Sequence, residues 1–182
     1  MTAVFECIES LDSFVEYDQM FAAAESRLDA NFFSQVPMPL SFDDKKLYYK
    51  DQIKSAYDRT WPLLQTEESV FFYKGTYDGT LMEFAGGFIE ADGITLRVNW
   101  YLTAPDAMDS RNSIHTAETA AIRKAFYAEH GLSRYRIMTF VGSSLYQWIK
   151  LRINSGAIVL ISETESPGHT SETNFVTFHL EV

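Results

Sequence analysis

The residue types that most often perform catalysis are few in this 182-residue chain, and they form no motif that specifies a reaction. No two of its four histidines have the spacing of metal ligands, so the sequence predicts no metal site. Cys7 is the only cysteine, which excludes an internal disulfide and a multi-thiolate zinc site and favours a reducing, cytoplasmic setting. Ser143 and Ser144 follow Gly142 but lack the glycine pattern of a nucleophile elbow, and helix capping explains them.

Two glutamates, one histidine and one tyrosine are the remaining acid–base candidates. Glu83, Glu90 and His115 could each accept a proton, directly or through water. Tyr146 carries a phenol that is chemically suitable as an acid. Each candidate also has a structural interpretation: surface carboxylates, a solvated loop histidine, and a tyrosine ring packed on a sheet with its hydroxyl at the rim. Both interpretations stay open at this point.

Composition narrows the class of protein. The chain is 46% hydrophobic and 15% aromatic, which excludes intrinsic disorder, and no stretch reaches the roughly 18 apolar residues of a membrane span. Its net charge of -10 argues against nucleic-acid binding, and its first ten residues lack the basic cluster of a signal peptide. Eight basic and four acidic residues lie between Arg97 and Arg152, a local excess that suits either a phosphate-bearing ligand or solvated helix faces.

Hydrophobic periodicity divides the first third of the chain into a strand and two helices. Residues 4–9 form the expected strand, and a helix should run from Ser10 or Ser13 to near Asn31. The prolines in segment 36–39 then break the chain. Ser41 and Asp44 start a second helix, which fades towards residues 61–62.

A three-stranded antiparallel meander is the clearest local prediction. Its strands are expected at residues 70–76, 81–90 and 94–103, separated by Asp78-Gly79 and Asp92-Gly93, because both residues of an Asp-Gly turn tolerate positive φ. The third strand alternates apolar residues at 94, 96, 98, 100 and 102, which should share one face. The segment 85–87 (Ala-Gly-Gly) suggests a bulge or a close backbone approach.

The remainder of the chain alternates helices and strands. A helix at 116–130 is stopped by Gly131, a strand follows at 135–141, and the next helix is ended by Gly156. Strands at 157–163 and 174–182 complete the order. We find no repeat or linker, so we expect a single domain over residues 1–182.

This order of elements resembles the Gcn5-related N-acetyltransferase (GNAT) superfamily over nearly the whole chain. The resemblance implies an α+β fold with a central mixed, mostly antiparallel sheet of about seven strands, flanked by four helices. It also implies that the strands at 94–103 and 135–141 splay apart into a wedge. A weaker echo, in segments 140–144 and 156–157, is similar to acetyltransferase-like proteins of short-tailed phages.

The resemblance also implies a site for acetyl-CoA. The backbone of Trp100, Tyr101 and Leu102 would polarise the acyl carbonyl, and Ser144 would touch the pantetheine arm or the phosphates. The pyrophosphate would lie on the loop before the central helix, which consists of Arg111, Asn112, Ser113, Ile114, His115 and Thr116. Ile114 and Thr116 depart from the family pattern, because small residues occupy these positions in its members.

The family's acid is often a tyrosine four residues before the glycine that closes the helix after the fifth strand. That position is Arg152 here, and Tyr146 stands nearer the start of the same helix. The resemblance therefore implies an acyl-CoA-dependent N-acyltransferase with Tyr146 and Glu83 as catalytic candidates and a small-molecule or peptide amine as acceptor. The alternatives are a catalytically inactive scaffold, such as a phage virion or host-interaction protein, and another α+β sandwich with the same element order. The sequence does not give the oligomeric state.

Overall fold

The computed structural model describes residues 2–9, 40–103, 117–156, 158–167 and 174–182. Within them, seven strands form one sheet in the order β1-β2-β3-β4-β5-β7-β6, and the β4–β5 pair is parallel while the other pairs are antiparallel. The strands are β1 (Ala3–Cys7), β2 (Val70–Tyr77), β3 (Thr80–Ile89), β4 (Thr95–Thr103), β5 (Arg134–Phe140), β6 (Val159–Pro167) and β7 (Asn174–Glu181). The described helices are α3 (Phe42–Thr60), the 3-10 helix η2 (Trp61–Gln65), α4 (Ala117–Glu129) and α5 (Ser144–Asn154).

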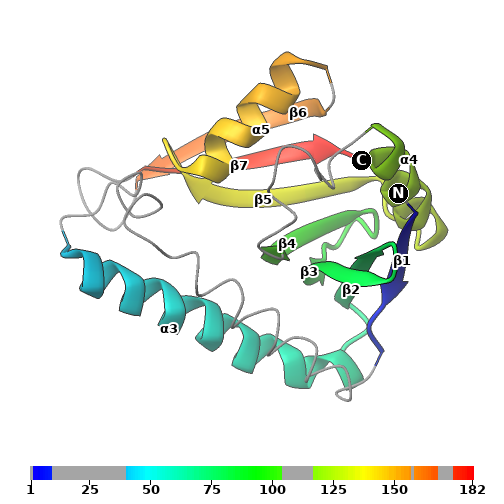
Figure 1. Cartoon of the computed structure of the whole chain (residues 1–182), viewed down its shortest axis with the longest axis horizontal. Coiled ribbons are helices and arrows are strands. Elements are labelled where there is room, and N and C mark those ends of the chain that lie inside the picture. Colours follow the sequence, from blue (N-terminus) through cyan, green and yellow to red (C-terminus); the bar gives the residue numbers. More distant parts are fainter. Residues whose placement is uncertain (1, 10–39, 104–116, 157, 168–173) are drawn as a thin grey trace.

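These elements confirm the predicted α+β class and its mostly antiparallel, seven-stranded sheet. The helix expected between residue 10 and Asn31 lies outside the described residues. β6 continues to Pro167, four residues beyond the expected strand end at 163. In Figure 1, α3 runs below the strands and α5 lies above β5 and β7.

Helix α4 packs on an aromatic core. Phe5 of β1, Tyr73 of β2 and Phe126 of α4 lie with their ring centroids 5.5–6.0 Å apart. All three are buried, together with Leu96 of β4. Burial of each such side chain contributes roughly 1.5–3 kcal/mol, so this cluster fixes α4 against the first half of the sheet.

Local sequence signals set several element boundaries as expected. Ser41 caps α3, because its hydroxyl accepts a hydrogen bond from the Asp44 backbone N–H at 3.2 Å. Asp78 has φ +48° and Gly79 φ +80°, which makes the tight β2–β3 turn that was predicted. The second Asp-Gly turn differs, since positive φ occurs at Gly93 but not at Asp92. The Asp92 carboxylate instead accepts hydrogen bonds from the backbone N–H groups of the next strand's first residues.

Strand β4 contains an extra residue that the alternation pattern did not reveal. Trp100 pairs with Gly86 and Val98 pairs with Gly87, so Asn99 has no partner on β3 and forms a β-bulge. A Cβ atom on Gly87 would collide with the Arg97 carbonyl oxygen, which explains the glycine there. The predicted irregularity at segment 85–87 is thus confirmed, although the inserted residue belongs to β4.

The bulge reverses which side chains of β4 face α4. Leu96 and Val98 pack on the aromatic core, and strict alternation would place Trp100 beside them. Tyr101 packs there instead. The expectation that residues 94–102 share one uninterrupted face is therefore wrong, because a single inserted residue shifts the two-residue period of a strand.

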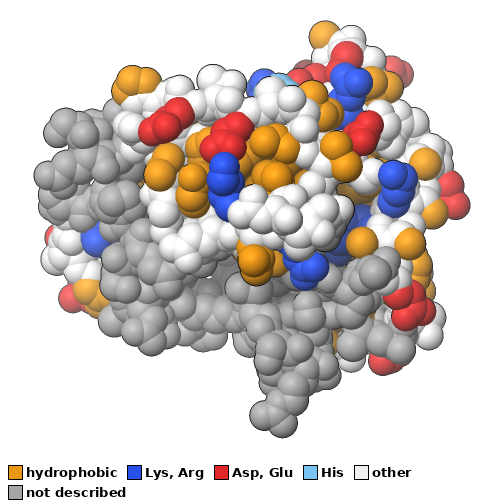
Figure 2. Space-filling model, turned by 90° about the horizontal axis from the view of Figure 1, so that it is seen from above, with side chains coloured by type: hydrophobic (Ala, Val, Ile, Leu, Met, Phe, Trp, Pro, Cys, Tyr) orange, Lys and Arg blue, Asp and Glu red, His pale blue; other side chains and the backbone are white. Residues whose placement is uncertain are grey.

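At the far edge of the sheet, β6 is exposed along most of its length. The exposed large apolar side chains on this side of the molecule include Val159 and Ile161 of β6 and Leu151 of the neighbouring α5. Figure 2 views the molecule from above the orientation of Figure 1 and shows hydrophobic side chains among acidic and basic ones on this face. No helix in the described part of the chain is long and apolar enough to span a membrane.

Candidate active site

Strands β4 and β5 are paired at only one end. Their parallel register covers Thr95–Val98 against Arg134–Ile137 and stops there. Beyond that point β4 stays paired with β3 as far as Thr103, and β5 stays paired with β7 as far as Phe140. Figure 1 shows the two strands diverging from this end. The predicted wedge is therefore present.

The bulge at Asn99 falls immediately after the last β4–β5 pair. A bulge bends its strand and increases the local twist, so its position accounts for the separation of β4 from β5. Residues 99–103 of β4 and 138–140 of β5 pair with β3 and β7 on their outer sides. On the sides where β4 and β5 face each other, these residues pair with no described strand. Backbone N–H and C=O groups on such edges need hydrogen-bond partners, which a ligand containing amides can provide.

A cavity of about 380 Å³ opens beside the wedge, between α4 and α5. Its floor includes Val98 and Tyr101 of β4 and Ile137 of β5. Its walls include Tyr127 of α4 and Trp148 of α5. Most of the lining is therefore apolar or aromatic, which is the usual character of small-molecule sites.

A buried ion pair stands next to this cavity. Glu83 is 0% exposed, and Arg123 donates to it twice, from Nη2 to Oε2 at 2.6 Å and from Nε to Oε1 at 3.3 Å. Tyr77 also donates its hydroxyl to Glu83 Oε2 at 3.0 Å. Glu83 is thus not the surface carboxylate of the structural interpretation, since β3 turns it inward against α4. Both carboxylate oxygens are occupied, so Glu83 fastens α4 to the sheet.

Tyrosines surround this ion pair. Tyr127 donates to the Tyr73 hydroxyl at 2.9 Å. Tyr101 also lines the cavity, but its hydroxyl has no hydrogen-bond partner among the described residues. Burial raises the pKa of Tyr101 well above its usual value; Glu83 adds to the rise and Arg123 opposes it. The phenol is therefore protonated at neutral pH and can donate to a ligand.

Tyr146 lies on a different side of α5 from the cavity-lining residues Trp148 and Ile149. The centroid of the Tyr146 ring lies 5.9 Å from that of Phe178 in β7 and 5.9 Å from the ammonium of Lys150. Tyr146 itself is not among the residues that line the cavity. The contact with Phe178 agrees with the structural interpretation of Tyr146, a ring packed on the sheet, and a catalytic role for its phenol stays a prediction.

Two serines follow Gly142, and the structure describes the side chain of only the first, Ser143. Ser143 is the N-cap of α5 and accepts a hydrogen bond from the Tyr146 backbone N–H at 3.0 Å. Its hydroxyl also lies 2.8 Å from that of Thr139 on β5. Helix capping therefore explains Ser143, as predicted. Ser144 is the first residue of α5, and its side chain lies outside the described part.

Several other candidates cannot be placed or lie elsewhere. The side chains of Trp100 and Leu102 and the entire loop from Arg111 to Thr116, including His115, lie outside the described residues. Glu90 pairs with Arg136 at 2.7 Å. No cluster of three potential metal ligands occurs in the described ranges.

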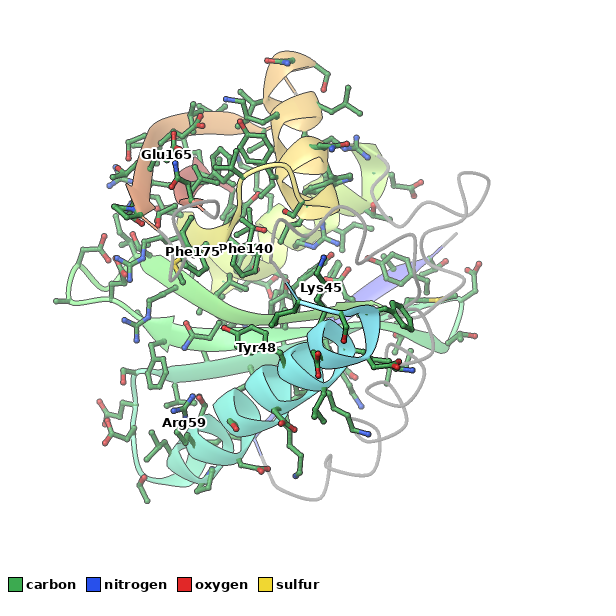
Figure 3. The ribbon with its side chains drawn as sticks, turned by 90° about the vertical axis from the view of Figure 1, so that its left-hand side faces the viewer. Lys45, Tyr48, Arg59, Phe140, Glu165 and Phe175 are labelled. Carbon is green, nitrogen blue, oxygen red and sulfur yellow. The ribbon has the colours of Figure 1, made fainter. Side chains whose placement is uncertain are left out.

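At the mouth of the wedge, two phenylalanines lie side by side. Phe140 of β5 and Phe175 of β7 are register partners with ring centroids 4.6 Å apart. Figure 3 looks at this end of the molecule and shows them above Lys45 and Tyr48 of α3. Sequence reasoning missed this pair, because the two residues meet only through the register of β5 against β7.

Comparisons with known proteins identify the fold. No family model and no curated protein sequence matches the chain. Among solved structures, the PaiA N-acetyltransferase from Thermoplasma acidophilum, in complex with coenzyme A, superposes with a TM-score of 0.56 at 9% identity, covering 97% of this chain and 98% of that one. A variant of the spermidine N-acetyltransferase SpeG from Vibrio cholerae gives 0.56 at 6% identity, covering 98% and 93%.

The Salmonella typhimurium acetyltransferase that modifies the N-terminal serine of ribosomal protein L7/L12 gives 0.56 at 8% identity, covering 100% of this chain and 96% of that one. A GNAT-family structure from Desulfovibrio desulfuricans aligns over 99% of both chains, at 12% identity and a TM-score of 0.54. None of these four is a phage protein. The chain has the GNAT fold.

Proposed function

We propose that this protein is an acyl-CoA-dependent N-acyltransferase that acylates an amine of a small molecule or peptide. The observation that carries the proposal is the divergence of β4 and β5 directly after Val98 and Ile137, which leaves two strand edges facing each other beside a cavity. The acetyltransferases that share the fold support it.

The strand edges suit the amide-bearing arm of acyl-CoA. Backbone groups of Trp100, Tyr101 and Leu102 on β4 would pair with the amides of the pantetheine arm and donate to the thioester carbonyl. The acyl-CoA supplies an activated thioester. The amine nitrogen forms a bond to the carbonyl carbon, the C–S bond breaks, and the proton lost by the amine ends on the departing sulfur.

The start of α4 suits the pyrophosphate. The N–H groups at a helix N-terminus and the helix dipole both favour anions, and α4 begins at Ala117, directly after the segment 111–116. Arg111 would add a positive charge and Ser144 a hydroxyl donor. On the acceptor side, the net charge of -10 favours a cationic amine approaching past α3.

The two catalytic candidates from the sequence can be separated by mutation. Glu83 would act as a base only if its hydrogen bonds to Arg123 and Tyr77 rearranged during the reaction. Tyr146 would act as an acid only through an intervening group, since its ring faces β7. Loss of turnover in Tyr146→Phe without loss of acetyl-CoA affinity would support its catalytic role.

Calorimetric titration with acetyl-CoA tests the proposal. We expect micromolar binding that Arg111→Glu abolishes and that Arg97→Glu, an equal charge change at an exposed position of β4, leaves within twofold. Replacing Ile114 and Thr116 by glycine should not weaken binding. No detectable binding at millimolar acetyl-CoA would contradict the enzyme and favour the catalytically inactive scaffold.

A further inference from the structure

The cavity between α4 and α5 is larger than an acetyl group needs. A small group the size of water occupies about 30 Å³ in a liquid. On that scale, a cavity of about 380 Å³ holds about a dozen such groups. The thioester of an acetyl donor would bring a single methyl group to the wedge.

The shape of the lining suits a chain. From Val98 and Ile137, where the strands part, the lining continues along α4 to Tyr127 and along α5 to Ile149. Ile158 and Val182 also line the cavity, and the Val182 N–H donates to the Ser133 carbonyl just before β5. These side chains offer carbon and aromatic surface, which favours an apolar occupant.

The charged side chains of the cavity lining are two arginines and the exposed carboxylate of Glu181, and together they do not call for an ionic occupant. Arg123 already pairs with Glu83, which neutralises it. Arg152 lies over the Trp148 ring, 5.5 Å from its centroid. Tyr101 adds one hydrogen-bond donor at the wedge end, where a carbonyl oxygen would lie.

From this geometry we propose that the acyl donor carries a chain of about six to ten carbons, which lies in the cavity between α4 and α5 with its thioester carbonyl near Tyr101. This inference rests on the proposed function, because it assumes that acyl-CoA occupies the wedge. On this inference, the preferred acyl-CoA carries a medium-length acyl group in place of an acetyl group.

Titration with free CoA and with acetyl-, hexanoyl- and octanoyl-CoA tests the inference without an acceptor. Each buried methylene should tighten binding by about fourfold, so octanoyl-CoA should bind at least tenfold more tightly than acetyl-CoA. Ala120→Phe places a ring in the cavity from an exposed α4 position and should remove this gain. Ala125→Phe, also exposed on α4 but outside the lining, should preserve it.

The outcomes separate the two proposals. Equal or weaker binding of octanoyl-CoA beside tight acetyl-CoA binding would overturn the chain inference and leave the acyltransferase standing. If Ala120→Phe and Ala125→Phe both lose the tighter binding of octanoyl-CoA, the chain inference would also be overturned, because the acyl chain would then lie elsewhere. Absence of binding by every thioester would refute the two proposals together. A circular dichroism spectrum and a urea unfolding midpoint equal to those of the unmodified protein show that Ala120→Phe is folded.

Discussion

Removing the positive charge of Arg123 should destabilise the protein strongly. In Arg123→Met, Glu83 would keep its charge at a position that is 0% exposed and would lose both hydrogen bonds from the guanidinium. Breaking a buried ion pair on one side costs about 3–5 kcal/mol. The hydrogen bond from Tyr77 remains and offsets a small part, about 1 kcal/mol. We therefore expect the free energy of unfolding to fall by about 2–4 kcal/mol.

Removing both charges should cost less, by about 1 kcal/mol. In Glu83→Met with Arg123→Met, no buried charge is left, and the main loss is the acceptor of the Tyr77 hydroxyl, about 1–3 kcal/mol. The double variant should thus be more stable than Arg123→Met alone. Urea unfolding followed by circular dichroism measures all three proteins. A loss below about 1 kcal/mol in Arg123→Met, or a double variant weaker than the single one, would refute the buried ion pair.

Three further predictions concern single side chains. Tyr101→Phe should weaken acyl-CoA binding about two- to tenfold, which corresponds to the loss of one hydrogen bond, whereas Tyr146→Phe should leave the affinity within twofold. Titration calorimetry measures both affinities, and equal effects of the two variants would contradict the placement of the two phenols. Burial and the nearby Glu9 raise the pKa of Cys7 to about 11, so its thiolate fraction at pH 8 is about a hundredfold smaller than that of a thiol of ordinary pKa, and iodoacetamide should label it correspondingly more slowly. Half-maximal labelling near pH 9 would refute this. Ser143→Ala removes the N-cap of α5 and should lower the free energy of unfolding by about 1–2 kcal/mol in urea, while Ser155→Ala, at the exposed end of the same helix, should change it by less than about 0.5 kcal/mol.

Much of the fold could be predicted because its signals are local. The Asp78-Gly79 turn, the Ser41 cap and the glycines that end α4 and α5 each act through their own backbone geometry. The resemblance of this element order to the GNAT superfamily then implied the sheet and its wedge. Contacts between distant segments were left undetermined, and two local features were missed: the residue inserted at Asn99 and the geometry of the second Asp-Gly turn.

The candidate site was harder to predict because burial of a polar group depends on its partner. Nothing near Glu83 in the sequence indicates that Arg123, forty residues later, neutralises it. Tyr146 was placed on the correct helix, but the side it faces depends on how α5 rotates against β7. The Phe140–Phe175 pair likewise exists only through strand register.

The inserted residue at Asn99 means that β4 consists of two half-strands in opposite phase. Counting by twos from Leu96 would therefore place Tyr101 on the face away from α4, whereas it packs on the aromatic core. A related chain that lacks the insertion would present a tryptophan where this one presents a phenol. Aligning this strand with one that lacks the insertion requires a one-residue gap at Asn99, and an alignment that omits the gap exchanges the two faces of β4.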